Sequence, residues 1–336
     1  MSAFQIPQKM KALVKKQEGP SYSYVEIEVP EPGDGEVLIR VDAVAICGSD
    51  IALYNWDNVA RVIATVPFIP GHECAGTVVK CGPNADIPLG TKVGVENHFF
   101  CGSCYQCLNE DGAICLNMGQ YGHGKKTQHG DAEQIAMLEP LGVAHNAIER
   151  LHVRGQDILV IGCGPVGLMA QAVAKALGAK RVVAVDVEDS KLELAKTIGA
   201  DVTVNSKQTD LKQFIAEFTN GVGMDRVCEC SGASAMVNAS CSFLRKGGYI
   251  GLVGLPKQPL HVENVLQDII FKALTLKTVH GRLIFHTWEQ SEALVADGKI
   301  NVKAVISHRF PMSQFEEAFK TLFSGEACKI VIDPSK

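Results

Sequence analysis

Hydrophobic and polar positions follow two different patterns along this chain of 336 residues. From Gly155 onward, short β-branched runs such as DILVIG and RVVAVD alternate with helical patterns such as LMAQAVAKALG and SKLELAKTIGAD. Strands that alternate with helices predict βαβ units and a doubly wound parallel sheet. Toward the C-terminus, TWEQSEALVADGKI and SQFEEAFKTLFSGEACKIVID predict two amphipathic helices and a final strand.

Before residue 150, apolar residues alternate singly with polar ones, as in EVLIRVDAVA, AGTVVKCG and TKVGVEN, and Gly and Pro interrupt the runs. Alternation with a period of two indicates half-buried strands, and the interruptions favour irregular, mainly antiparallel pairing. A chain of this length forms two domains more often than one. We therefore expect an α/β protein with an antiparallel β domain followed by a parallel-sheet domain.

Composition and charge narrow the possible partners and the cellular compartment. Hydrophobic residues make up 46% of the chain, and its net charge of −5 includes no polybasic run for phosphates or anionic lipids. The N-terminus has no apolar core of signal-peptide length, and no apolar run is long enough to span a bilayer. We expect a cytoplasmic protein that binds neither nucleic acid nor membranes. In that reducing compartment, twelve cysteines favour metal ligation over disulfides.

A glycine-rich turn predicts a dinucleotide site. Gly162, Gly164 and Gly167 follow G-x-G-x-x-G spacing, with Val166 between them, after a predicted strand and at the start of a predicted helix. In that context the glycines let backbone amides approach a pyrophosphate at the positive helix end. Asp186 ends the next strand, where a carboxylate accepts hydrogen bonds from ribose hydroxyls and repels a 2′-phosphate. NAD is therefore favoured over NADP; the alternative is a glycine turn that binds nothing.

Four cysteines gather in one short stretch: Cys101, Cys104, Cys107 and Cys115. Their C-x2-C-x2-C-x7-C spacing lets four thiolates converge on one ion and leaves no open position, so we expect a structural zinc that stiffens the loop. Ferredoxins also use C-x2-C-x2-C, but their fourth cysteine is spaced differently and is usually followed by proline, whereas Leu116 follows here. An iron–sulfur cluster and cysteines without metal are the less favoured alternatives.

Three further motifs are ICGSD at 46–50, PGHECAGTV at 70–78 and LEPLGVAHNA at 138–147. Together with the glycine and cysteine motifs, they make nearly the whole chain resemble the zinc-containing medium-chain alcohol dehydrogenases. Within that superfamily the sequence is most similar to the polyol (sorbitol-like) and L-threonine 3-dehydrogenase branch. The segments that favour the threonine enzymes are YNWD at 54–57, HGR at 280–282, TW at 287–288 and SHRF at 307–310.

The resemblance implies a fold of two parts. A GroES-like catalytic domain would occupy residues 1–150, completed by residues 287–336, and a Rossmann domain over residues 151–286 would bind NAD. In the family a strand-bearing segment separates the equivalents of Gly130 and Asp131, which are adjacent here. Either this loop is short or residues are absent from the chain, so the resemblance does not define the shape of the substrate pocket.

Cys47, His72 and Glu73 offer a thiolate, an imidazole and a carboxylate from two separated loops, a mixed set that suits catalytic zinc with one open position. The resemblance implies that these residues are the ligands. It also implies that Asp50 contacts and orients His72 without binding the metal itself, and that Glu139 either coordinates this zinc or holds its water. The alternatives are a buried apolar Cys47, a simple polar pair of His72 with Glu73, and a surface Glu139.

The resemblance also implies the chemistry. Zinc would polarise a substrate hydroxyl so that the alkoxide forms near neutral pH, and the adjacent carbon would pass a hydride to the nicotinamide. Ser49 matches the hydroxyl that accepts the alcohol proton, although serine is also common in turns. Many relatives carry a relay histidine where this chain has Ala52. The relay would therefore end on cofactor ribose hydroxyls or on water.

In relatives the loop that carries Val253 and Leu255 contacts the nicotinamide, and positions matching Lys191 and Arg282 lie near the cofactor. The alternative for Lys191 is an exposed helix charge. We expect a zinc- and NAD-dependent dehydrogenase of a small polar secondary alcohol, either an L-threonine-like 3-hydroxy amino acid or a polyol. The alternatives are a sorbitol or xylitol dehydrogenase proper and, in a different class, a non-catalytic nucleotide-binding or structural member of the fold.

The segment LTLKTVHG at 274–281 predicts the final strand of the parallel sheet. In relatives this edge pairs with its counterpart across a two-fold axis, which satisfies backbone groups that a monomer leaves unpaired. We therefore expect a homodimer through this strand, or a homotetramer built from two such dimers. The alternative is that Thr275 and Lys277 keep the edge solvated.

Overall fold

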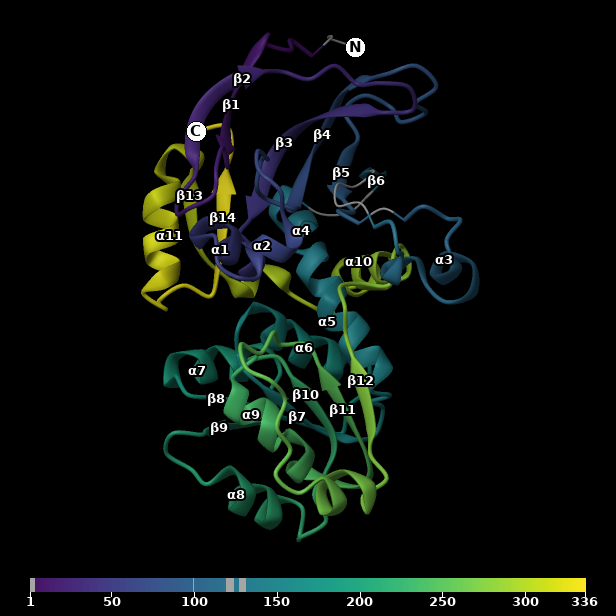
Figure 1. Cartoon of the computed structure of the whole chain (residues 1–336), viewed down its shortest axis with the longest axis vertical. Coiled ribbons are helices and arrows are strands. Elements are labelled where there is room, and N and C mark those ends of the chain that lie inside the picture. Colours follow the sequence, from purple (N-terminus) through teal and green to yellow (C-terminus); the bar gives the residue numbers. More distant parts are fainter. Residues whose placement is uncertain (1–3, 99, 119–123, 127–130) are drawn as a thin grey trace. The chain divides into compact units, whose positions relative to one another are not determined.

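The computed structural model describes residues 4–98, 100–118, 124–126 and 131–336. It divides the chain into two compact units, Met1–Glu139 with Ile306–Lys336, and Pro140–Val305 (Figure 1). The sequence analysis placed the two divisions after residues 150 and 286. In the structure the first division falls inside one continuous helix, α5 (Leu138–Arg150), and the second falls after α10 (His286–Ala296).

The second unit is built on a six-stranded parallel sheet, as the alternation of strands and helices predicted. Its strands are β7 (Asp157–Ile161), β8 (Arg181–Asp186), β9 (Val202–Asn205), β10 (Met224–Glu229), β11 (Leu244–Leu252) and β12 (Thr275–Thr278). They lie in the order β12-β11-β10-β7-β8-β9. Every position of β7 is buried, which explains its continuous apolar sequence. The strand order reverses between β7 and β10, the place where open α/β sheets bind their ligands.

Helices connect these strands. They are α6 (Pro165–Ala176), α7 (Asp189–Ile198), α8 (Leu211–Phe218) and α9 (Ser234–Ala239), with short helical turns at Ser240–Phe243 and Leu266–Ile270. α10 and a further turn at Val302–Val305 follow β12. α6 packs on β7 and β8, and α7 packs on β8 and β9. Pro165 takes the first position of α6, where its missing N–H removes no helical hydrogen bond.

The first unit contains a six-stranded, mainly antiparallel sheet and a separate hairpin, as expected. The strands of the larger sheet are β3 (Val37–Ala45), β4 (Glu73–Cys81), β5 (Lys92–Val95), β6 (Gly124–Lys126), β13 (Ile306–Pro311) and β14 (Lys329–Asp333). Their order is β13-β14-β3-β4-β5-β6, and of the described pairs only β13–β14 is parallel. The hairpin consists of β1 (Lys9–Val14) and β2 (Ser23–Glu28).

The C-terminal residues complete the core of this first unit. Its helices are α1 (Gly48–Asn55), α2 (Ala60–Ile63), α3 (Tyr105–Asn109), α4 (Ala132–Ala136) and α11 (Phe315–Phe323), with single turns at Gly112–Ile114 and Met312–Gln314. Phe315 and Phe319 of α11 and Ile332 of β14 belong to one apolar cluster with Ile46 and Trp56. The C-terminal helix and final strand that the sequence predicted are confirmed.

Three further expectations concern the strand β12, the junction of Gly130 with Asp131, and membrane-spanning helices. β12 is an outer strand of the parallel sheet, as predicted. The junction of Gly130 with Asp131, where the sequence left open a short loop or absent residues, lies partly outside the described residues, which resume where Asp131 caps α4. Within the described ranges, no helix has the length and apolar character needed to cross a membrane.

Candidate zinc and dinucleotide sites

The pairing of β3 with β4 brings three metal-binding side chains together. Ala45, at the end of β3, lies opposite Glu73, at the start of β4, so Cys47 reaches the same place as His72 and Glu73. The Cys47 sulfur, a His72 ring nitrogen and a Glu73 carboxylate oxygen all lie within 4.8 Å of one another. This donor set fits a zinc ion that keeps an open position.

Asp50 joins helix α1 to this cluster. Its Oδ2 accepts a 2.9 Å hydrogen bond from the backbone N–H of Cys47, while its Oδ1 lies 3.7 Å from Nδ1 of His72. The side chain is buried, and the Tyr22 hydroxyl donates to the backbone carbonyl of Asp50 at 3.1 Å. A carboxylate that faces Nδ1 favours the tautomer protonated there, which leaves Nε2 free to bind a metal.

The other ring nitrogen of His72 faces Ser49, whose Oγ lies 3.5 Å from Nε2. Burial alone would lower the pKa of His72, but a hydrogen bond with the Cys47 sulfur and the negative charges around the ring raise it well above its ordinary value. The cluster therefore concentrates negative charge around the imidazole, as a site that binds a divalent cation requires.

A buried lysine that the sequence analysis missed pairs with Glu73. Lys329, in β14, is 3% exposed, and its Nζ lies 2.7 Å from Oε1 and 2.5 Å from Oε2 of Glu73, which is 1% exposed. Burial alone would lower the pKa of Lys329, but the charges of Glu73 and Cys47 raise it, so the lysine stays protonated. Burial raises the pKa of Glu73, and Lys329 opposes that shift. The available signal was a lysine directly before the apolar run IVI of the strand KIVID.

Glu139 is buried in the first turn of α5, so the alternative of a surface carboxylate is wrong. Its Oε1 accepts a hydrogen bond of 3.3 Å from Nδ2 of Asn97, a second partner that sequence patterns did not reveal. The Glu139 charge contributes to raising the pKa of His72 and of Glu73. Glu139 therefore acts electrostatically on His72 and Glu73, although it is not a member of the closest group of donors.

The four cysteines of the 101–115 loop also converge, with all their sulfur atoms within 4.8 Å of one another. Hydrogen bonds, first from the backbone of Ser103 and then from Asn117, lower the pKa of Cys101 to about 5, which favours the thiolate that metals bind. Burial and the neighbouring thiols have the opposite effect on Cys107 and raise its pKa to about 12. Four sulfurs around one point fit a closed, structural zinc site, and all twelve cysteines are free of disulfides.

The geometry of the turn after β7 requires two of its glycines. Gly162 has a backbone φ of +95°, which residues other than glycine rarely adopt. A Cβ on Gly167 would lie 1.9 Å from the carbonyl oxygen of Gly162, so only glycine lets α6 pack this closely on β7. At Gly164, which caps α6, a Cβ would meet no atom within 4 Å. The helix therefore begins next to open space, where its N–H groups can bind a phosphate.

Asp186, at the end of β8, holds the same turn in place. Its Oδ2 accepts a hydrogen bond of 2.7 Å from the N–H of Cys163, and its Oδ1 accepts bonds from the N–H groups of Val187 and Glu188 at 2.7 and 3.0 Å. The carboxylate is thus fixed beside the glycine turn and remains partly exposed. A carboxylate in this position can accept hydrogen bonds from the adenosine ribose.

The other predicted cofactor residues lie in the same unit. Val166, in the first turn of α6, and Lys191, in α7, are partly exposed. Val253 and Leu255 follow β11, and Leu255 is exposed. Arg282, by contrast, is buried, and a Cβ added to Gly142 of α5 would lie 2.6 Å from its Cδ. The structure therefore gives Arg282 a packing role that the other four residues lack.

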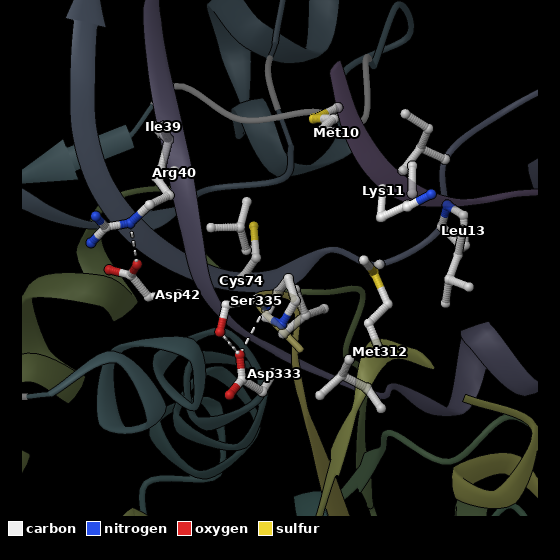
Figure 2. A pocket seen from close by; sticks show the side chains of 18 of the residues that line it. Met10, Lys11, Leu13, Ile39, Arg40, Asp42, Cys74, Met312, Asp333 and Ser335 are labelled. Atoms are coloured by element: carbon white, nitrogen blue, oxygen red, sulfur yellow. Dashed lines mark hydrogen bonds and ion pairs between the residues drawn. The ribbon is translucent and has the colours of Figure 1, made fainter. Parts of the chain in front are cut away.

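A cavity of about 690 Å³ lies within the first unit, lined mostly by apolar side chains such as Met10, Leu13 and Met312 (Figure 2). Consecutive residues of β1 and of β3 line it, so the cavity faces strand edges rather than one face of a sheet. Asp50 and Cys74 border it, and burial raises the pKa of Cys74 to about 11. The three zinc donors are not among its lining residues.

Comparisons with known proteins identify the family of this chain. The model of the alcohol dehydrogenase GroES-like domain matches residues 33–143, and that of the zinc-binding dehydrogenase domain matches residues 165–297. The L-threonine 3-dehydrogenase of Bacillus licheniformis is 37% identical over 97% of this chain and 99% of its own. That of Thermococcus kodakarensis is 35% identical over 98% of this chain and 99% of its own. The chain belongs to the zinc-containing medium-chain alcohol dehydrogenase family.

A solved structure agrees with the fold of this dehydrogenase. An alcohol dehydrogenase from Escherichia coli, complexed with NADH, matches it with a TM-score of 0.88 at 25% identity, over 97% of this chain and all of the other. The expectation of a zinc- and NAD-dependent oxidoreductase is confirmed. The non-catalytic alternative is set aside, because the family models and the curated relatives are those of zinc-dependent dehydrogenases.

The two zinc sites of the dehydrogenase should respond differently to the loss of one thiolate. Cys47→Ser should abolish NAD reduction and leave about one zinc per chain, because it breaks the open site and spares the closed one. Cys104→Ser should lower the melting temperature, because a structural zinc contributes folding free energy. Zinc analysis, turnover and thermal melting check both variants, with Cys328→Ser as the control. Near-native turnover of Cys47→Ser would contradict the catalytic assignment.

Asp186→Ala should relax the choice of cofactor. The change removes both the ribose acceptor and the charge that faces a 2′-phosphate, so the ratio of kcat/KM for NAD to that for NADP should fall about tenfold or more. Steady-state kinetics with the two cofactors measure this ratio. Glu193→Ala, which removes an exposed carboxylate from α7, is the control. A wild-type enzyme that already prefers NADP would overturn the interpretation.

Proposed function

We propose that this dehydrogenase oxidises the secondary hydroxyl of a small 3-hydroxy amino acid, L-threonine or a close analogue, and passes the hydride to NAD. The observation that carries the proposal is the activity named for its curated relatives. Those from Bacillus, Legionella and Thermococcus, at 33–37% identity, are L-threonine 3-dehydrogenases. A polyol dehydrogenase is the alternative, and these relatives do not favour it.

Cys47, His72 and Glu73 would hold the catalytic zinc. When bound, zinc supplies a Lewis acid that lowers the pKa of the substrate hydroxyl, and NAD supplies the hydride acceptor. Lys329 places a positive charge against Glu73 and so offsets part of the negative charge that the donors bring into a buried site. Asp50 would keep the His72 ring in the orientation that presents Nε2.

Ser49 would take the proton from the substrate hydroxyl. Its Oγ lies 3.5 Å from Nε2 of His72, so the hydroxyl borders the metal-binding side of the ring. A serine hydroxyl both accepts and donates a hydrogen bond, which lets it pass a proton onward. Ala52, buried in the same helix, offers no next carrier. The proton would therefore leave through cofactor ribose hydroxyls or through water.

The cofactor would lie along the carboxyl ends of the parallel strands. Its pyrophosphate would meet the start of α6, its adenosine ribose Asp186, and its nicotinamide the loop of Val253 and Leu255. β8 and β11 lie on opposite sides of the central β7–β10 pair. These residues are therefore separated as the two halves of a dinucleotide require.

A substrate panel tests the proposed specificity. With NAD as cofactor, kcat/KM for L-threonine should exceed the values for sorbitol, xylitol and 2,3-butanediol about tenfold or more, because an amino acid offers charged groups that these alcohols lack. NADH absorbance measures each rate, and Cys47→Ser provides the background. Faster turnover of sorbitol or xylitol would replace the proposal with the polyol alternative.

We also propose a homodimer through β12, with a homotetramer built from two such dimers. On one side β12 pairs with β11, and its other side carries no strand among the described residues. Apolar side chains are exposed in β12 and in the turn before it: Leu276 is 43% exposed, Phe271 57% and Ile270 59%. An open strand edge together with apolar side chains suits pairing with an identical strand.

Light scattering at dilute concentration tests this assembly. The wild-type dehydrogenase should have the mass of a dimer or tetramer, and Leu276→Lys should shift the mass toward the monomer, because two lysines would face each other across the dyad. Val62→Lys, which replaces an exposed apolar residue of the first unit, should leave the mass unchanged. A wild-type monomer that turns over substrate would remove the interface.

We place the dehydrogenase in the cytoplasm. Twelve cysteines free of disulfides suit a reducing compartment. Its partners there are a small-molecule substrate and copies of itself, because a net charge of −5 without a polybasic run does not suit nucleic acid or anionic membranes.

A further inference from the structure

Glu229 is a buried carboxylate that neither the zinc chemistry nor the cofactor contacts described above use. It ends β10, beside the point where the strand order reverses, and none of its surface is exposed. Burying a carboxylate is unfavourable unless hydrogen-bond donors or a cation compensate its charge. N–H and O–H donors from the loop that follows β10 compensate it here.

That loop follows β10 directly. The N–H and the hydroxyl of Ser231 both donate to Oε1 of Glu229, the N–H at 3.0 Å, and the N–H of Gly232 lies 3.2 Å from Oε1 and 3.1 Å from Oε2. The backbone carbonyl of Glu229 accepts hydrogen bonds from the N–H groups of Val253 and Gly254, each at 2.9 Å. One residue therefore connects the loop after β10 to the loop after β11.

These loops are also packed closely against one another. A Cβ on Gly254 would lie 2.1 Å from the nitrogen of Gly232 and 2.6 Å from Oε2 of Glu229. On the other side, a Cβ on Gly162 of the glycine-rich turn would lie 2.9 Å from the nitrogen of Ser231. The loop that Glu229 holds is thus packed between the pyrophosphate turn and the residues that follow β11.

We propose that Glu229 is a positioning residue for the nicotinamide half of NAD. Its carboxylate fixes residues 230–232, and these fix the loop of Val253 and Leu255 against which the nicotinamide would lie; the inference rests on the cofactor site proposed above. Glu229 should affect the nicotinamide half of NAD and not the adenosine half. Asp186 and the adenosine half would lie on the β8 side of β7, whereas β10 and β11 lie on the other side. A glutamine would keep the shape but direct an amide NH2 at N–H donors and lose hydrogen bonds.

Binding measurements on the zinc-loaded enzyme test this inference without turnover. In isothermal titration calorimetry, Glu229→Gln should weaken NAD binding about tenfold and leave the affinity for ADP-ribose, which lacks nicotinamide, within about twofold. Ser231→Ala, which removes only the hydroxyl donor, should weaken NAD binding about threefold. Glu263→Gln, an exposed residue of the same unit, is the matched control and should change neither affinity.

Each outcome decides the inference. A Glu229→Gln enzyme that binds NAD as tightly as the wild type would overturn it, and so would equal losses for NAD and ADP-ribose. If Glu229→Gln does not fold, an unchanged NAD affinity in Ser231→Ala overturns the inference, and a selective loss of NAD affinity there supports it. A wild-type enzyme that binds neither ligand would refute the cofactor site itself and this inference with it.

Discussion

The buried ion pair between Glu73 and Lys329 ties the catalytic cluster to the end of the chain. The two residues lie 256 positions apart in sequence, and both are almost completely buried. Removing one partner would leave an unpaired charge in the interior, which typically costs about 3–5 kcal/mol. The pairing of β14 with β3 therefore supplies the charge that compensates Glu73 in the candidate zinc site. The packing of α11 against Ile46 and Trp56 accompanies the same return.

Asp50 serves the same cluster through local structure. One of its oxygens accepts from the backbone at the start of α1, and the other faces His72, so the residue that begins the helix also orients a ligand. At the far end of the helix, Lys15 donates hydrogen bonds to the carbonyls of Tyr54, Ser21 and Gly19 from a buried position. Helix α1 is thus fixed at both ends, and Ser49 is held beside the zinc donors.

The second unit builds its site in a different way. At the carboxyl ends of two of its strands, Asp186 and Glu229 hold loops, and the groups proposed to meet the cofactor are backbone N–H groups and the Asp186 carboxylate. Asp186 accepts from three N–H groups at the end of β8, and Glu229 performs the same task at the end of β10. Hydrogen-bonded carboxylates therefore set the shape of this edge, and glycines let the loops approach one another.

Much of the protein was predictable from sequence wherever the relevant residues are close together in the chain. The turn from Gly162 to Gly167 and the quartet from Cys101 to Cys115 are local patterns whose spacing alone brings their atoms together, and the alternation of strands and helices predicted the parallel sheet. The resemblance to a known family carried this further, to Cys47, His72 and Glu73.

Only the tertiary structure identified the partners that those residues need. Lys329 meets Glu73, Asn97 meets Glu139, and Arg282, expected near the cofactor, is buried. Each contact joins residues distant in sequence through strand register or helix packing, and a single lysine or asparagine in a strand or loop gives no sign of the element it will meet. The spacing of residues along the sequence determined which metal and cofactor chemistry the chain could carry. The pairing of β14 with β3 decided which charged side chains would be buried beside Glu73.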